Sequence, residues 1–403
     1  MTAREIKKGA IVSCMLFVCL FPFLPKLIET LIFLLFVLGS AYYVWINSKF
    51  YINIYSSSPE LVKLRKLFFW FIILSIFYFF ISFFNIPKLW RINGLLFDWT
   101  YIPRHYLIVA ESFFPVFFGH ALYRINIFGQ LKLLPLLASF VLILFGINAL
   151  CVKGLLLVIL VFISIKCNRK SLLLLAFFIH YEQSAYVLGY IVMTFLVFFE
   201  KPIANYLYTN TYKKIICIKL VAVVLLFAVM GVIMIYVEND PNSLWRLHVW
   251  MNEIESLAQT RFLGVGFGSA YVTDDIIYQV DNSNMYFDNA DGAFEKGAFL
   301  VANHSSLLNM FYRMGVIGGI LFFSMNIQLI RVVVKLYRHA NNDKKALLWR
   351  LFAVWIYQTV VIFLNPGLEM MQFAISYLLC LSFLVAVILD IQLPLQVVPQ
   401  KCE

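Results

Sequence analysis

The chain has 403 residues, of which 63% are apolar and only 13% are charged, and its 32 Lys and Arg residues against 21 Asp and Glu residues give a net charge of +11. A soluble domain carries about 25% charged residues, so this composition excludes an ordinary soluble domain. It also excludes a disordered chain, because the apolar surface is more than enough to offset the entropy lost on folding. Successive long apolar segments instead predict an integral membrane protein.

Transmembrane helices need about 20 apolar residues, because a backbone in lipid must satisfy its own hydrogen bonds. Twelve segments come close to this requirement: residues 11–24, 27–46, 67–84, 106–123, 133–150, 154–165, 171–181, 185–199, 215–236, 307–330, 351–364 and 372–389. The pair 171–181 and 185–199 can also be drawn as one long tilted helix, which would leave eleven spans. No small-residue cleavage site follows the basic N-terminus, so we expect an uncleaved first span and no signal peptide.

The distribution of charge favours twelve spans over eleven. If the N-terminus lies in the cytoplasm, an even number puts most Lys and Arg residues in cytoplasmic segments and both termini on that side, as the positive-inside rule requires. The net charge then reflects topology and attraction to anionic lipid, and does not indicate nucleic-acid binding. The expected fold is an all-α, polytopic transmembrane bundle, with about nine spans over residues 1–236, a periplasmic loop with short helices over 237–306, and further spans with a cytoplasmic tail over 307–403.

Apolar residues recur at nearly helical spacing between residues 243 and 258 of this loop: Trp245, Val249, Trp250, Ile254 and Leu257. The pattern predicts a surface helix. Arg246 precedes Trp250 by four residues and therefore shares its face. Such a helix could lie on the membrane with Arg246 bound to lipid phosphate, or it could hold Arg246 at a substrate site.

A glycine-rich run follows this predicted helix, with Gly264, Gly266 and Gly268 alternating after Arg261. Glycine lets backbone N–H groups approach an anion, and Arg offers planar, bidentate donors for phosphate. Tight turns and close helix packing use the same residues, so both interpretations stay open. No strand–turn–helix unit surrounds the run, which excludes a dinucleotide-binding fingerprint.

Two further candidates lie where the loop re-enters the membrane. His304 stands at the head of segment 307–330, where the helix dipole favours a neutral imidazole suited to general-base work. The alternative is an interfacial His304 beside an N-cap formed by Asn303 or Ser305. Arg313 lies about two turns inside the same apolar segment, where a charge costs about 3 kcal/mol unless it is paired or hydrated. We expect it either to extend toward the interface or to line a wet cavity.

These elements occur in one order: Trp245-Arg246 with Trp250, the run from Phe262 to Gly268, His304, and then Gly315 and Gly318. In this order and spacing, mainly over residues 244–320, the chain resembles the bacterial O-antigen polymerase and O-antigen ligase superfamily of Wzy-type and WaaL-type proteins. The resemblance implies an inverting membrane glycosyltransferase, without metal or cofactor, that uses undecaprenyl-diphosphate-linked oligosaccharides at the periplasmic face of the inner membrane. Membrane lipids and a chain-length regulator protein are the further partners it implies.

The resemblance also implies roles for particular residues. His304 and Arg246 match the family's histidine and loop arginine and are the expected catalytic residues. In this chain Ser305 follows His304, where the family usually has Asn. The residues expected to bind diphosphate are Arg261, Arg313, Gly264, Gly266 and Gly268, and those expected to stack on sugar rings are Trp245 and Trp250. The composition agrees on one point, because no His or Cys cluster has metal-ligand spacing.

Three functions fit these features. The leading hypothesis is polymerisation of O-antigen or a related surface polysaccharide. An O-antigen ligase that transfers the glycan to lipid A core is the nearest alternative, and the residues do not separate the two. A polysaccharide or lipid transporter is the second alternative, for which paired half-helices and polar groups at mid-membrane would be expected.

Overall fold

The computed structural model describes residues 58–110, 112, 114–124, 150–166, 170–171, 173, 184–209, 241–273, 305–364, 368 and 371–392. These residues are mostly helical, as predicted. Three of the helices are long and apolar enough to cross a membrane: α4 (Pro59–Ser82), α17 (Ser306–His339) and α18 (Asn342–Leu364). They support the expected membrane protein. Predicted segments 11–24, 27–46 and 215–236 lie outside the described residues, as does most of 133–150 and of 171–181.

The chain forms two compact units, and each combines segments that are distant in sequence. The first unit contains Met1–Ile72, Leu107–Glu200 and Phe323–Glu403, and the second contains Ile73–Tyr106 and Lys201–Phe322. Helices α4 and α17 contribute residues to both units.

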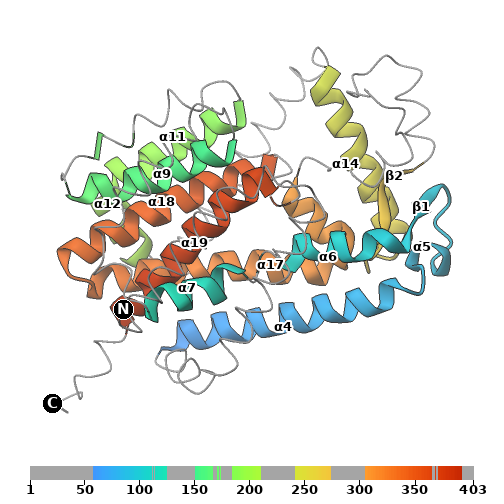
Figure 1. The fold of residues 1–403 in the computed structure, drawn as a ribbon, viewed down its shortest axis with the longest axis horizontal. Coiled ribbons are helices and arrows are strands. Elements are labelled where there is room, and N and C mark those ends of the chain that lie inside the picture. The colour runs from blue at the N-terminus through green and yellow to red at the C-terminus, as the bar shows by residue number, and fades with distance from the viewer. Residues whose placement is uncertain are drawn as a thin grey trace, which may run out of the picture. The chain divides into compact units, whose positions relative to one another are not determined.

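The described part of the first unit is a helical bundle. Its helices are α7 (Phe114–Arg124), α9 (Leu150–Lys166), α11 (Ser184–Phe198), α18 and α19 (Met371–Gln392). Helix α19 packs against α7, α9 and α18, and α18 packs against α9 and α11 (Figure 1). The tightest approach is at Gly119 of α7, where an added Cβ would lie 2.7 Å from the carbonyl oxygen of Ser382. Trp349 and Trp355 are fully buried in this bundle, as expected of helices that are apolar on all sides.

The segment predicted as one span over residues 106–123 differs from the prediction. It forms two helices, α6 (Ile102–Ala110) and α7. Pro115 is the second residue of α7, a position that tolerates proline, whereas proline further inside a helix would break its hydrogen bonds. The Ser112 hydroxyl donates to the carbonyl oxygen of Val109 at 2.6 Å and so satisfies a group at the end of α6. The chain also bends by 86° between Tyr186–Phe198 of α11 and Glu200–Leu207 of α12 (Glu200–Thr209).

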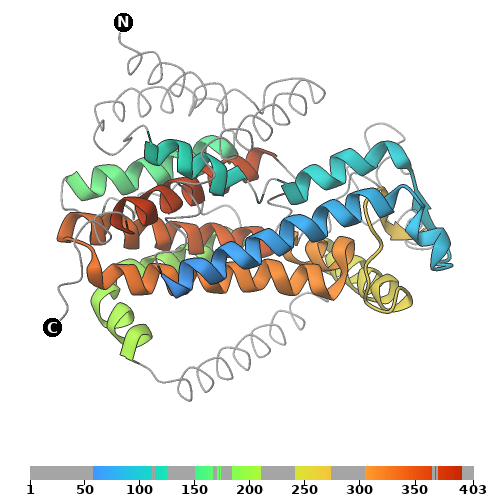
Figure 2. The same cartoon turned by 90° about the horizontal axis from the view of Figure 1, so that it is seen from below.

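The second unit combines parts of α4, α6 and α17 with elements of the predicted loop 237–306 and of the stretch between the predicted spans 67–84 and 106–123. These are α5 (Ile86–Leu89), β1 (Leu95–Phe97), the short 3-10 helix η2 (Trp99–Tyr101), α14 (Pro241–Gln259) and β2 (Ser269–Thr273). Helix α14 confirms the helix predicted over residues 243–258. Strands β1 and β2 pair antiparallel, with Leu95 opposite Thr273, an arrangement that the all-α expectation did not include. Figure 2 shows α14 beside the end of α4 and the first turns of α17.

Candidate functional site

The glycine-rich run forms a turn that links α14 to β2, and its three glycines are buried. We call residues 261–268 the glycine turn. Gly264, Gly266 and Gly268 have φ values of 86°, 73° and 82°, in the left-handed region that L-residues with a Cβ avoid. Space is also lacking: a Cβ on Gly266 would lie 2.8 Å from Ser82 Oγ, and one on Gly268 would lie 3.0 Å from the carbonyl oxygen of Asp98.

All three glycine N–H groups bind within the protein. Gly264 donates to Thr260 Oγ1 at 3.1 Å, Gly266 to the carbonyl oxygen of Arg313 at 3.0 Å, and Gly268 to His105 Nδ1 at 3.1 Å. The structure therefore agrees with the tight-turn interpretation of the run. Diphosphate binding by these N–H groups, the other interpretation, would require the internal bonds to be exchanged for ligand bonds.

The glycine turn also supplies backbone hydrogen-bond partners where α17 is broken. Gly315, with φ 67° and ψ −174°, interrupts α17. In a continuous helix the carbonyl oxygens of residues 312 and 313 would accept from N–H groups four residues later. Here Val265 donates to the oxygen of Tyr312 at 2.9 Å and Gly266 to that of Arg313, while Val316 donates to the oxygen of Phe262 at 3.0 Å. Because unpaired backbone groups are costly in an apolar layer, the turn stabilises the break.

We call these backbone hydrogen bonds between the glycine turn and α17 the interlock. Arg313 lies at its centre and is completely buried. Its Nη1 donates to the carbonyl oxygens of Ser269 at 2.5 Å and Gly266 at 3.4 Å, and its Nε donates to Asn309 Oδ1 at 3.3 Å. The guanidinium carbon lies 4.3 Å from the ring centre of Tyr271, within range of a cation–π interaction. Arg313 therefore does not extend to the interface, one of the two outcomes expected for it. Its Nη2 has no hydrogen-bond partner among the described residues.

Helix α14 lies beside the start of α17 (Figure 2). Two of its buried residues, Glu253 and Ser256, lie close to the Tyr312 side chain. The Tyr312 hydroxyl donates to the carbonyl oxygen of Ala270 at 2.8 Å, and its ring stacks near that of Tyr271, with the ring centres 6.4 Å apart. The result is a buried layer of aromatic and charged groups at the base of the glycine turn.

Sequence reasoning missed His105 and Ser82. His105 is buried, and because its Nδ1 accepts from Gly268, the neutral ring carries its proton on Nε2. Ser82 Oγ accepts from the N–H of Phe267 at 2.8 Å. No motif surrounds either residue. The available signal was their position beside the stretch between the predicted spans 67–84 and 106–123: Ser82 lies near the end of the first span, and His105 directly precedes the second.

Arg261 is the exposed cation of the glycine turn. Arg261 and Phe262 have φ values of 52° and 63°, which cost about 1–2 kcal/mol each in residues other than glycine. Bonds on both sides hold this conformation: Phe262 donates its N–H to the oxygen of Leu257 at 2.8 Å, and the Tyr78 hydroxyl donates to the oxygen of Leu263. The strained turn therefore presents the Arg261 side chain at the surface, together with the half-exposed Phe262 and Leu263.

The predicted catalytic residues are only partly covered by the structure. Trp245 and Arg246 lie on α14, but their side chains are outside the description, and Trp250 is half-buried. His304 lies outside the described residues. Ser305 confirms one expected cap, because its Oγ accepts from the N–H of Leu308 at 3.4 Å. The pairing of Arg246 with His304 stays a prediction, as do the diphosphate and sugar contacts.

Comparison with models of protein families and with curated proteins finds none that matches this chain. The resemblance to polymerases and ligases therefore rests on the order of its short motifs.

Proposed function

We propose that this chain is a membrane glycosyltransferase that polymerises repeat units of O-antigen or a related surface polysaccharide. The donors are undecaprenyl-diphosphate-linked oligosaccharides, used at the periplasmic face of the bacterial inner membrane. The observation that carries the proposal is the contact between α14 and the start of α17 at Glu253, Ser256 and Tyr312. Arg246 precedes Glu253 by two helical turns, and His304 precedes Tyr312 by a similar number of residues. Arg246 thus belongs to a helix that lies beside the start of α17, and His304 precedes α17 by two residues in the sequence.

Transfer of a glycan from a lipid diphosphate requires stabilisation of the leaving group and removal of a proton from the acceptor. The departing diphosphate needs positive charge, which Arg246 and the exposed Arg261 supply in this proposal. The acceptor hydroxyl must lose a proton, which His304 accepts as general base while the oxygen attacks the anomeric carbon with inversion. Arg313 acts through the glycine turn, because it holds the carbonyl groups of Gly266 and Ser269. Direct diphosphate binding by Arg313 would require its guanidinium to leave these groups.

The decisive experiment is turnover by the purified full-length chain of a defined lipid-linked oligosaccharide, followed by mass spectrometry. We expect products that increase in mass by whole repeat units when no lipid A core is added to the reaction. The variants Arg246→Ala and His304→Ala should abolish this growth, while Lys88→Ala, which removes an exposed cation of the second unit, should leave it intact. Retained turnover in both variants would contradict the catalytic assignment.

The same assay separates the alternatives. A ligase would give a product only when core acceptor is added. A transporter would give no covalent product and would instead move the lipid-linked oligosaccharide across a vesicle membrane. Gels of lipopolysaccharide from a deletion strain provide an independent check, because loss of a polymerase leaves single-repeat caps, whereas loss of a ligase leaves polymer on the lipid carrier.

A further inference from the structure

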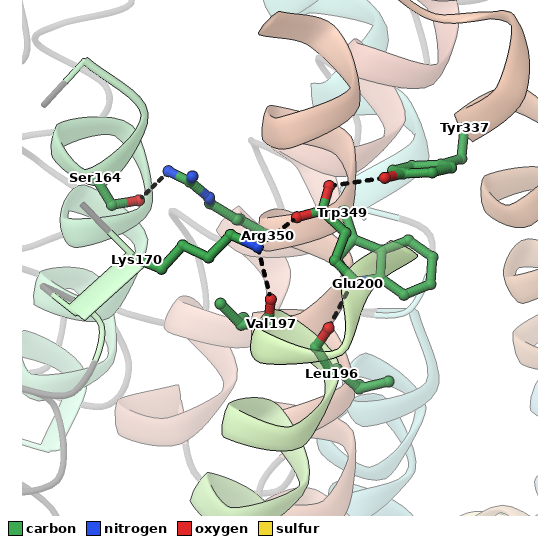
Figure 3. Close-up of polar contacts among 8 residues, drawn as sticks. All are labelled: Ser164, Lys170, Leu196, Val197, Glu200, Tyr337, Trp349 and Arg350. Carbon is green, nitrogen blue, oxygen red and sulfur yellow. Dashed lines mark hydrogen bonds and ion pairs between the residues drawn. The ribbon is translucent and has the colours of Figure 1, made fainter. Parts of the chain in front are cut away.

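A second polar cluster lies in the first unit and contains no residue that was assigned a role above. Figure 3 shows its centre, the carboxylate of Glu200 at the start of α12, which is almost fully buried. Lys170 Nζ lies 3.1 Å from this carboxylate, and the Tyr337 hydroxyl donates to it at 2.9 Å. Lys170 also donates to the carbonyl oxygen of Val197 at 3.2 Å, at the end of α11. Glu200 is thus already paired with one cation.

Arg350 of α18 brings a second positive charge to this cluster, and its side chain is only 2% exposed. Its Nη1 donates to the hydroxyl of Ser164 at 2.8 Å, which is a neutral partner. Its Nε has no hydrogen-bond partner among the described residues. The carboxylates that form ion pairs in the described part of the chain, those of Glu60, Glu200 and Asp390, are bound to lysines. Glu200 also interacts electrostatically with Arg350. One carboxylate balances only one of the two cations, so the cluster of Lys170, Arg350 and Glu200 keeps one positive charge in excess, which an anion can neutralise.

Arg350 lies near a part of α11 that reaches the surface. The buried Trp349 joins α18 to α11 there, because it donates its indole N–H to the carbonyl oxygen of Leu196 at 2.7 Å. The Lys170 side chain is partly exposed, so the cluster reaches the surface there. Phe195 and Phe199 flank the carbonyl groups that Trp349 and Lys170 bind, and both rings are about half exposed. An apolar chain can therefore lie against α11 beside the charged groups.

We propose that Arg350, Lys170 and Ser164 bind the phosphate group of an anionic phospholipid, whose acyl chains lie along Phe195 and Phe199. A guanidinium, an ammonium group and a hydroxyl together match the donors that a phosphate diester requires. Basic pockets between transmembrane helices recognise such headgroups on the cytoplasmic side, which is the side that the positive-inside rule predicts for Lys170 and Arg350. The exposed phenylalanines favour a lipid over free phosphate.

The test uses the purified full-length chain in detergent and measures its thermal unfolding temperature. Dioleoylphosphatidylglycerol should raise this temperature by several degrees, whereas dioleoylphosphatidylcholine and inorganic phosphate should not. Arg350→Gln should abolish the response. Without lipid this variant should stay folded, because Gln keeps a hydrogen-bond donor at this position and Glu200 remains paired with Lys170. Lys66→Gln is the matched control, since it removes an exposed cation of the first unit and should keep the response.

Three results would overturn the proposal: a full response in Arg350→Gln, an equal response to phosphatidylcholine, or an equal response to inorganic phosphate, which would assign the site to a free anion. A second measurement does not depend on the folding of a variant. In native mass spectra of the natural chain, phosphatidylglycerol should remain bound under activation that removes phosphatidylcholine. Loss of both lipids at the same activation would also refute the site.

Discussion

The guanidinium of Arg313 donates to the carbonyl oxygen of Ser269, with 2.5 Å between Nη1 and the oxygen. This bond joins a long apolar helix to the first residue of strand β2. From the sequence, Arg313 is a charge inside a membrane span. In the structure it is a hydrogen-bond donor to backbone carbonyl groups.

The first prediction concerns this bond. Arg313→Met keeps much of the side-chain volume but leaves the oxygens of Gly266 and Ser269 without their donor. We expect a loss of about 2–3 kcal/mol of unfolding free energy, the usual effect of losing a charged hydrogen bond in a buried site. Thermal unfolding in detergent measures it. Arg331→Met, an exposed cation on the same helix, should change stability by no more than about 0.5 kcal/mol. Equal stability of the two variants would show that Arg313 does not hold the turn.

The second prediction separates backbone strain from close packing. Gly315 and Gly94 have nearly equal φ values, 67° and 68°, but a Cβ on Gly315 would lie 2.5 Å from the oxygen of Phe262, whereas Gly94 is exposed. Gly94→Ala should cost about 1 kcal/mol from the left-handed conformation alone. Gly315→Ala should cost clearly more, because it also separates the glycine turn from α17. The unfolding temperatures of the two variants measure these two costs in stability. Similar decreases in unfolding temperature would argue against the interlock.

The third prediction tests the bond between His105 and Gly268. His105→Phe keeps an aromatic ring beside Tyr271 but removes the acceptor for the buried N–H of Gly268. An unsatisfied buried donor costs about 1–3 kcal/mol, so the variant should unfold at a lower temperature. Arg104→Ala, on the exposed neighbour, serves as the control and should be close to neutral. Unchanged stability of His105→Phe would mean that water replaces the imidazole at this position.

The fourth prediction concerns Arg261, which is exposed on the strained turn. If it binds the departing diphosphate, Arg261→Ala should lower turnover by about 10–100-fold, the equivalent of one charged hydrogen bond in the transition state. Stability should stay within about 0.5 kcal/mol of the natural chain, because the side chain is at the surface. Arg261→Lys should recover only part of the activity, since it cannot bind bidentately. Full turnover in Arg261→Ala would remove this residue from the site.

Local patterns predicted the helices that depend on them. The spacing of apolar residues predicted a helix over residues 243–258, and α14 covers Pro241–Gln259. Hydropathy likewise located α17 and α18, because long apolar helices are specified by nearby residues. The break after α6 was missed, although Pro115 carries a local signal for it.

The candidate site was less accessible from sequence because its contacts join distant segments. The partners of Arg313 are carbonyl groups of residues 266 and 269, which become available only when the glycine turn folds against α17. His105 belongs to no motif and gains its role from one bond to Gly268. The glycine run was recognisable from the sequence. The reason for it is the set of backbone hydrogen bonds that it forms with α17 at the break at Gly315, and these bonds join two segments that are distant in sequence.

The break in α17 has a consequence for the depth of these groups in the bilayer. The helix contains 34 residues, yet the part that follows Gly315 is long enough by itself to cross an apolar layer of about 30 Å, at a rise of about 1.5 Å for each residue. The turns before Gly315 can therefore stand above the hydrocarbon, among headgroups. The positive charge of Arg313 then stays outside the hydrocarbon layer, and the exposed Arg261 of the glycine turn is accessible to charged groups from the aqueous side.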